Sequence, residues 1–212
     1  MTIIRSDNNI YLKPLLCFDD YIYKHSVAIN RLWDDEVIDA ILEHLSDDTD
    51  ILDIGANIGL VTLGLIQKAT QRSIRINKIH CFECDPTTFH LLSQNMTSLP
   101  IVQLYPFAVG QTRQLCTLQL NKYNRGCNYI DNTIDNTGQT FYSYPHHTVN
   151  QDEYALKATQ PTVFIPSLPL DDILYQFKKR ISVIKIDIEG FEFQALKGAE
   201  QLIKTHYPVI IV

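Results

Sequence analysis

The segment DIGANIG, at residues 53–59, holds the residues whose types and spacing point most directly to chemistry. Asp53 lies near the end of an apolar run, and Gly55 and Gly59 bracket the turn before a helical pattern. Open α/β sheets bind ligands beyond the carboxyl ends of their strands, and a glycine turn lets a ligand approach the backbone closely. A dinucleotide-binding turn would have the spacing GxGxxG, with pyrophosphate at the helix N-terminus. The spacing GxxxG and the nearby acid disfavour pyrophosphate and favour a ligand with an ammonium group.

A second carboxylate, Glu83, ends the next apolar run and is followed by Cys84 and Asp85. A carboxylate at the end of the second strand of such a sheet can accept hydrogen bonds from both hydroxyls of a ribose. The ligand that suits both acids is an adenosine with a cationic amino-acid tail, and S-adenosylmethionine fits this description. The alternative is structural: Asp53 and Glu83 would only cap strand ends, and the glycines would only form a turn.

The run KIDIE alternates charged residues with isoleucines at residues 185–189. In an extended strand, Lys185, Asp187 and Glu189 would share one face, at the end of the strand where a methyl donor and its acceptor would meet. We hypothesise that Glu189 or Asp187 is the general base that takes the proton of an acceptor hydroxyl, with Lys185 setting the local potential. A structural ion-pair network is one alternative. A divalent cation is another, but two acids are a thin ligand set, so we predict no metal.

Five short apolar runs must supply the strands that position these residues. They lie at residues 50–55, 78–84, 101–109, 182–188 and 208–212. Because patterns of helical period separate these runs, the sequence predicts an α/β domain with a doubly wound parallel sheet. The crossover helices are expected at 59–70, 87–96 and 193–205, and an earlier amphipathic helix is expected from an N-cap at Asp34 to about Ser46.

Two segments do not follow this alternation. Residues 1–32 predict a short hairpin or an irregular lead-in to one domain at 33–212. Residues 113–122 alternate like a strand, whereas 123–162 are rich in Asn, Tyr, Thr, Gln and Gly. The latter composition predicts a long surface excursion with one hairpin. Loops in this place often contact substrate, so we expect the excursion to contact the acceptor.

The composition excludes several classes of function. The 212 residues include 18 Lys plus Arg and 24 Asp plus Glu, which gives a net charge of −6. An acidic chain without a basic block lacks the charge pattern of a nucleic-acid-binding protein. No apolar stretch approaches the roughly 20 residues of a membrane span, so no membrane partner is expected.

The cysteines indicate the compartment. They number five, and the first residues contain no run typical of a signal peptide, so we predict a reducing, cytoplasmic location. Cys81 and Cys84 have CxxC spacing without a second pair, which favours packing over a zinc site.

Taken in order, the motifs resemble those of the FkbM-type methyltransferases. The resemblance runs from about Trp33 to Val212 and rests on DIGANIG, FECDP at 82–86, AVG at 108–110, LDD at 170–172 and KIDIEGFE at 185–192. It implies a class I, Rossmann-like fold that uses S-adenosylmethionine and releases S-adenosylhomocysteine. It also implies O-methylation of a sugar, a glycan or a polyketide-type small molecule.

The resemblance also implies roles for individual residues. Asp53 would lie near the amino group of the cofactor, and Glu83 would hold the ribose. The other cofactor-binding residues that it implies are Gly55, Ala56, Asn57 and Gly59 around the methionine part, Cys84 and Asp85 after Glu83, Ala108 and Val109 beside the adenine, and Asp187.

The chain departs from the family pattern at its end, PVIIV. Class I methyltransferases continue past strand five with a helix and an antiparallel pair of strands. We therefore expect a sheet that ends at strand five, with an apolar edge that invites pairing into a homodimer. The alternative to an enzyme is an inactive or truncated binding domain with the same fold. A nicotinamide-dependent oxidoreductase is disfavoured by the GxxxG spacing and by Asp53.

Overall fold

The computed structural model describes residues 4–5, 11–12, 34–121, 125–131, 133–134, 140–141 and 161–212. Trp33 and most of the predicted excursion lie outside these residues. Strand β1 (Ile4–Arg5) pairs antiparallel with β2 (Tyr11–Leu12), which confirms the hairpin expected near the start of the chain. Strand β9 (Thr133–Ile134) pairs antiparallel with β10 (Thr140–Phe141), which is the hairpin expected in the excursion.

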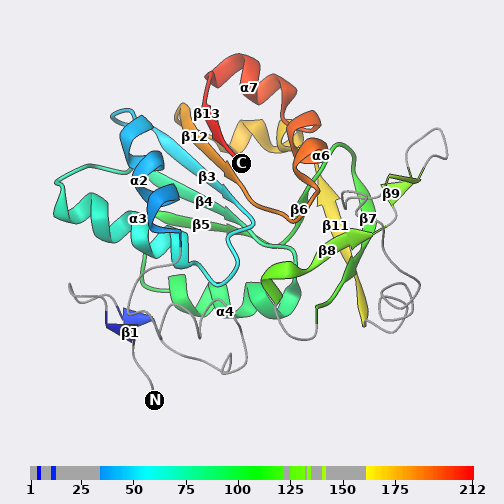
Figure 1. The fold of residues 1–212 in the computed structure, drawn as a ribbon. Helices are drawn as coiled ribbons and strands as arrows, with labels where there is room; N and C mark the ends of the chain where they lie inside the picture. Colours follow the sequence, from blue (N-terminus) through cyan, green and yellow to red (C-terminus); the bar gives the residue numbers. More distant parts are fainter. Residues whose placement is uncertain are drawn as a thin grey trace.

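A five-stranded parallel sheet forms the centre of the molecule (Figure 1). Its strands are β3 (Asp50–Ile54), β4 (Lys78–Phe82), β5 (Val102–Tyr105), β12 (Ile181–Ile186) and β13 (Val209–Ile211). Across the sheet their order is β13-β12-β3-β4-β5, and every neighbouring pair is parallel. All five apolar runs thus contribute strands, and the predicted doubly wound α/β class is confirmed. The winding direction reverses between β3 and β12, which is where such sheets open a crevice at their carboxyl ends.

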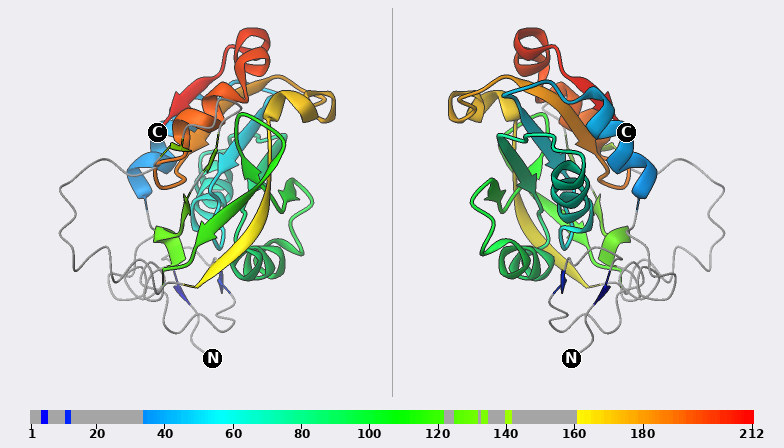
Figure 2. Two further views of the ribbon diagram at one scale, coloured as in Figure 1. Left: turned by 90° about the vertical axis from the view of Figure 1, so that its right-hand side faces the viewer. Right: turned by 90° about the vertical axis from the view of Figure 1, so that its left-hand side faces the viewer.

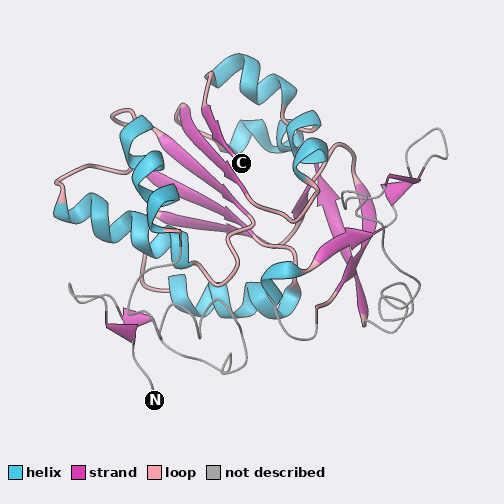
Figure 3. Ribbon diagram, in the orientation of Figure 1, coloured by secondary structure: helices cyan, strands magenta, loops and turns pink. Residues whose placement is uncertain are grey.

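Helices cover both faces of this sheet (Figure 3). On one face lie α2 (Asp35–His44), α3 (Leu60–Gln71) and α4 (Pro86–Met96). Their apolar side chains form one core with Ile51, Ile79 and Val183 of the strands. On the other face lie the 3₁₀ helix η2 (Leu170–Gln176), α6 (Glu192–Lys197) and α7 (Glu200–His206), which pack on alternate residues of the same strands, such as Leu52 and Ile184. A parallel sheet buried on both faces explains the continuous apolar runs.

The helix predicted at 193–205 is two helices rather than one. The chain bends at Gly198, where a Cβ atom would lie 1.9 Å from the carbonyl oxygen of Gly110. Helix α7 begins anew because the carboxylate of Asp171 accepts hydrogen bonds from the backbone N–H groups of Gln201 and Leu202, each at 2.9 Å. The segment 193–205 has a continuous apolar pattern. It is nevertheless divided into two helices, because Gly198 lies against the backbone of Gly110 and Asp171 caps the second helix.

The sequence does not predict a second, four-stranded sheet, which lies beyond the carboxyl ends of the central strands (Figures 1 and 2). Its order is β6-β11-β7-β8, from β6 (Ala108–Val109), β7 (Gln114–Gln119), β8 (Tyr129–Asp131) and β11 (Thr162–Leu168). The strand predicted at 101–109 is wrong as one element, because it divides at Pro106 into β5 and β6. Strand β11 was not predicted because it contains Pro166, and a proline within a run argues against a strand. In the structure, Pro166 pairs with Leu115 of β7.

No helix in the described part of the chain has both the length and the apolarity that crossing a bilayer requires.

Candidate active site

A cavity of about 410 Å³ lies where the carboxyl ends of β3, β4 and β12 meet the small sheet. Its walls come mainly from residues 54–57, 82–84, 107–109, 126–128 and 187–189. The cavity thus brings together residues predicted from sequence at the ends of three different strands, namely Gly55 after β3, Glu83 after β4, and Asp187 and Glu189 after β12. The volume is within the range of small-molecule sites.

The turn after β3 passes close to the turn after β12, and this crossing requires glycine at position 55. Gly55 has φ +79°, and a Cβ atom there would lie 1.9 Å from the carbonyl oxygen of Asp187. Asn57 also has a positive φ, +50°, and its side-chain oxygen accepts a hydrogen bond from the N–H of Ile58 at 2.7 Å. Residues 55–57 line the cavity.

Gly59 has a different role from the one predicted. It has φ +95° and precedes α3, but it does not line the cavity. A Cβ atom there would lie 2.0 Å from the terminal methyl group of Met96 and 3.0 Å from Leu92. Gly59 therefore allows α4 to pack against the turn, and the expectation that it wraps a ligand is corrected.

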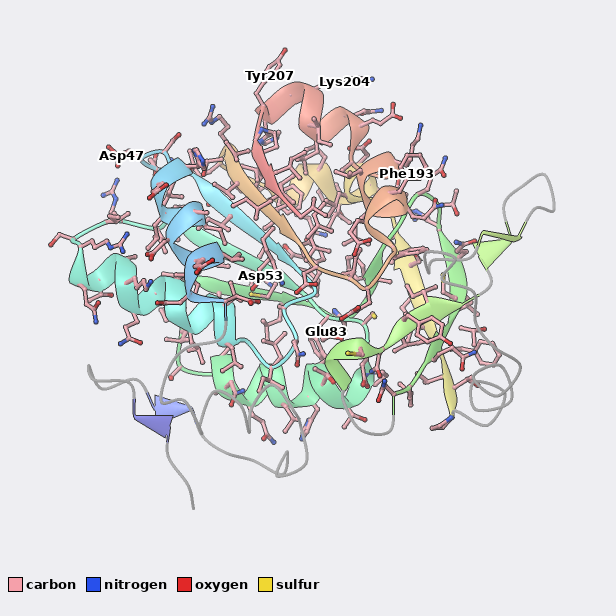
Figure 4. All side chains as sticks on the ribbon, in the orientation of Figure 1. Asp47, Asp53, Glu83, Phe193, Lys204 and Tyr207 are labelled. Atoms are coloured by element: carbon pink, nitrogen blue, oxygen red, sulfur yellow. The ribbon has the colours of Figure 1, made fainter. Side chains whose placement is uncertain are left out.

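Glu83 lines the cavity at the end of β4 (Figure 4). Its carboxylate accepts hydrogen bonds from the N–H groups of Asn57, at 3.0 Å, and Asp85, at 2.8 Å. Burial raises the pKa of Glu83 to about 7, against the lowering effect of these N–H groups. The side chain thus ties the glycine turn to the end of β4 and changes its charge close to neutral pH.

The two residues after Glu83 differ in position. Cys84 lines the cavity, whereas Asp85 is buried and absent from the lining. The carboxylate of Asp85 caps α4 by accepting from the N–H of Thr87 at 2.8 Å, and it accepts from the side-chain amide of Asn128 at 2.9 Å. Asp85 therefore positions the cavity wall at 126–128 instead of facing a ligand, which corrects its predicted role.

Cys81 and Cys84 are both free thiols, and Cys81 is buried in the core. The core packing predicted for Cys81 is thus present, whereas Cys84 lines the cavity. Among the described residues, no three His, Cys, Asp or Glu side chains are grouped so that they could hold a metal ion.

Asp53 does not reach the cavity. It is fully buried, accepts a hydrogen bond from the Thr62 hydroxyl at 2.7 Å, and lies 3.3 Å from the ammonium group of Lys185. Lys185, in turn, lines the cavity and donates a hydrogen bond to the carbonyl oxygen of Gly55 at 2.9 Å. The expectation that Asp53 lies beside a ligand's amino group is therefore corrected, because Lys185 occupies its carboxylate.

Lys185 keeps its charge in this buried position. Burial alone would lower its pKa, but the charges of Asp53, Asp187 and Asp34 outweigh that effect and raise the pKa above its ordinary value. The Lys185 ammonium lies 3.7 Å from a carboxylate oxygen of Asp187. The ion-pair network considered from sequence is thus present, and it supports the backbone of the glycine turn.

Asp187 and Glu189 both line the cavity, but not as residues of a strand. Strand β12 ends at Ile186, and Glu189 lies in the following turn with φ +54°. The carboxylate of Glu192 holds this turn by accepting from the N–H groups of Ile188, at 3.2 Å, and Gly190, at 3.0 Å. The turn brings the two acids to the cavity, so the predicted alternation along one strand face is wrong.

Burial raises the pKa of Glu189, and the nearby charges of Asp187 and Glu192 add to this effect. A carboxylate with a raised pKa at the edge of a cavity can accept a proton from a bound hydroxyl. Of the predicted catalytic residues, Glu189 thus lines the cavity with a raised pKa, whereas Lys185 holds the turn.

An apolar wall forms another part of the cavity lining. The predicted Ala108 and Val109 belong to it, and sequence reasoning missed the others, which are Phe107, Leu118, Ile130 and Phe191. All but two of these residues belong to strands of the small sheet. Phe107 lies between β5 and β6, and Phe191 precedes α6. The wall is completed by residues 126–128, which lie within the segment predicted as a long excursion.

Asp34 was predicted only as the N-cap of a helix, and it occupies that position before α2. Its backbone has φ +55°, its side chain makes no capping hydrogen bond, and it lines the cavity. An acid before an amphipathic helix usually indicates a cap, so the local pattern gave no signal of this second location.

Comparison with known proteins identifies the family. The model of the FkbM methyltransferase domain matches residues 53–212. "Methyltransferase 1" of Beauveria bassiana (strain ARSEF 2860) is 27% identical over 203 residues, which are 93% of this chain and 74% of the relative. The crystal structure of methyltransferase FkbM from Methylobacillus flagellatus KT is similar to 78% of this chain, with 21% identity and a TM-score of 0.47. This chain spans 32% of that structure. With a match over most of its length, the chain belongs to the FkbM methyltransferase family.

Proposed function

We propose that the protein is an S-adenosylmethionine-dependent methyltransferase that transfers a methyl group to a hydroxyl oxygen of a small molecule or glycan. The observation that carries this proposal is the position of Glu83, in the cavity at the switch point and hydrogen-bonded to the glycine turn. A carboxylate at this place suits the two hydroxyls of a ribose.

The residues of the cavity fit the parts of S-adenosylmethionine. Glu83 would accept hydrogen bonds from the ribose, and the backbone of residues 55–57 would lie along the amino-acid part. Ala108 and Val109, with Phe107, would pack against the adenine, because flat apolar walls suit an aromatic base. When bound, the cofactor supplies an electrophilic methyl group on a sulfonium.

The acceptor must be oriented and must lose a proton. Methyl transfer requires in-line approach of the acceptor oxygen, so the cavity walls contribute by positioning. Glu189 would take the hydroxyl proton as the oxygen attacks, since its carboxylate lines the cavity. Substituting Glu189→Gln would then abolish turnover while leaving cofactor binding intact, whereas a domain that only binds would have no turnover to lose.

Calorimetric titration with S-adenosylhomocysteine tests the cofactor assignment, with NAD as the control ligand. Saturable one-to-one binding of the nucleoside, strongly weakened by Glu83→Gln, is expected. Glu43→Gln in α2 is the matched control, because Glu43 is exposed and absent from the cavity lining. A folded protein that binds NAD but not S-adenosylhomocysteine would overturn the proposal.

A further inference from the structure

Asn128 lies between the 3₁₀ helix η1 (Arg125–Cys127) and β8, and it lines the cavity. Its side-chain amide makes two hydrogen bonds. The amide oxygen accepts from the backbone N–H of Asn121, just past the end of β7, at 2.7 Å. The amide nitrogen donates to the carboxylate of Asp85, at the start of α4, at 2.9 Å. Asn128 therefore ties the cavity wall at 126–128 both to the small sheet and to the segment that follows β4.

The two partners of Asn128 explain why an amide occupies this position. A backbone N–H needs an acceptor, whereas a carboxylate needs a donor. Asparagine provides both on a short side chain, while aspartate provides only acceptors and an aliphatic residue provides neither. The carboxylate of Asp85 is buried, and a buried charged group that loses a donor is costly. Few side chains could therefore replace the amide of Asn128.

Asp85 connects Asn128 to the carboxylate that carries the proposed function. Its side chain also accepts from the N–H of Thr87, at 2.8 Å, and from the hydroxyl of Thr88, at 3.1 Å. Helix α4 and Asn128 thus hold the Asp85 carboxylate together. The backbone N–H of Asp85 donates to Glu83 at 2.8 Å. A continuous series of hydrogen bonds therefore runs from Asn128 through Asp85 to Glu83.

The charges of this series are also linked. Burial raises the pKa of Glu83 to about 7, and the negative charge of Asp85 contributes to that rise. Asn128 is neutral, so it holds the Asp85 carboxylate without adding a charge near Glu83. A change of charge at either position should therefore alter the ionisation of Glu83.

We propose that Asn128 is a positioning residue for the cofactor site, because it holds Asp85 and thereby keeps Glu83 and the wall at 126–128 in place around the ribose. This inference rests on the proposed function and deepens it. It assigns to a residue of the predicted excursion a part in placing the ribose carboxylate. Asn128 acts through Asp85, since its amide is engaged by its two protein partners.

An exchange of amide and carboxylate tests this role, with calorimetric titration of S-adenosylhomocysteine between pH 5 and pH 9. Asn128→Asp puts a second acceptor and a negative charge beside Asp85. It should weaken binding about fivefold at pH 7 and move the midpoint of the pH dependence upward, because the added charge opposes ionisation of Glu83. Asp85→Asn should move the midpoint downward, because it removes a negative charge. In the double variant donor and acceptor change places, so affinity and midpoint should return toward the wild-type values.

A control variant and a second measurement separate this role from general damage. Gln176→Glu makes the same chemical change at an exposed position of η2, outside the cavity lining, and should leave affinity and midpoint unchanged. Urea denaturation of each variant identifies any that do not fold. None of the variants alters the other titratable groups that line the cavity, which are Asp34, Cys84, Cys127, Lys185, Asp187 and Glu189.

The outcomes distinguish this inference from the proposed function. Binding of S-adenosylhomocysteine that depends on Glu83 but has the same affinity and midpoint in Asn128→Asp would overturn the inference alone. A loss of affinity without a change of midpoint, and without recovery in the double variant, would also overturn it, because the effect would then be structural. A folded wild-type protein that does not bind S-adenosylhomocysteine would overturn both.

Discussion

Two buried polar clusters occupy opposite faces of the central sheet. The first, the Asp53 cluster, joins Asp53 to Lys185 and Thr62 on the face covered by α3. The second, the His80 cluster, lies on the face covered by η2, α6 and α7. There, the two ring nitrogens of His80 lie 3.1 Å from a carboxylate oxygen of Asp50 and 3.0 Å from the hydroxyl of Tyr105.

The clusters differ in what they reach. Lys185 of the Asp53 cluster lines the cavity and holds the carbonyl oxygen of Gly55. The residues of the His80 cluster are absent from the cavity lining, and Phe177 packs edge-on against the imidazole ring at 5.0 Å. Buried polar residues in one sheet can therefore reach the cavity or stay within the core. Proximity to the carboxyl ends of the strands at the switch point separates the two cases.

Removing the cation of the Asp53 cluster should have the largest effect. Lys185→Met would leave the Asp53 carboxylate buried without its partner, which costs about 3–5 kcal/mol of unfolding free energy. Urea denaturation measures this loss, and the double variant Asp53→Leu, Lys185→Met should recover much of it. A loss below about 1 kcal/mol for the single variant would contradict the account of Asp53 and Lys185 as a buried ion pair.

A milder change in the His80 cluster sharpens the contrast. Tyr105→Phe deletes one hydroxyl and leaves a buried imidazole nitrogen without its partner, so we expect a loss of about 1–2 kcal/mol of unfolding free energy. The affinity for S-adenosylhomocysteine should not change, because the Tyr105 hydroxyl points into the core. A matching loss of affinity in calorimetry would contradict the assignment of this cluster to the core alone.

The pH dependence of binding should follow Glu83. A ribose donates hydrogen bonds best to the ionised carboxylate, so binding favours the charged form of a group whose pKa is about 7. Between pH 8 and pH 6 the affinity for S-adenosylhomocysteine should fall about tenfold, because the ionised fraction falls by that factor. In Glu83→Gln the dependence should disappear, and a pH-independent affinity in the wild type would contradict this role.

The same raised pKa has an opposite consequence for stability. Between pH 4.5, the ordinary pKa of Glu83, and pH 7, the folded protein keeps a proton that the unfolded chain releases. The contribution of Glu83 to the unfolding free energy of the ligand-free protein therefore decreases as pH rises through that window. Comparison of the wild type with Glu83→Gln in urea at pH 5 and pH 8 measures this contribution.

Local patterns in the sequence were sufficient for the central sheet and for part of the site. The strands of a doubly wound sheet are continuous apolar runs, and the acid and the glycines after two of them, such as Glu83 and Gly55, mark the cavity. The direction of a side chain was harder to predict, because Asp50 and Asp53 lie in the same strand and their basic partners, His80 and Lys185, are more than 25 residues away along the chain.

The missing parts of the prediction depend on contacts between distant segments. Strand β11 contains Pro166 and becomes a strand by pairing with β7 and β6, which come from earlier in the chain. Asp34 reaches the cavity because α2 packs on α3, and nothing in its local sequence indicates that packing. The second sheet and the cavity wall could therefore not be predicted from local sequence, because they depend on contacts between segments far apart in the chain.

The most direct test is a crystal structure of the protein with S-adenosylhomocysteine. The account predicts ribose hydroxyls within hydrogen-bond distance of Glu83 and the adenine against Ala108 and Val109. A ligand bound elsewhere, or bound in this cavity with its ribose away from Glu83, would contradict it.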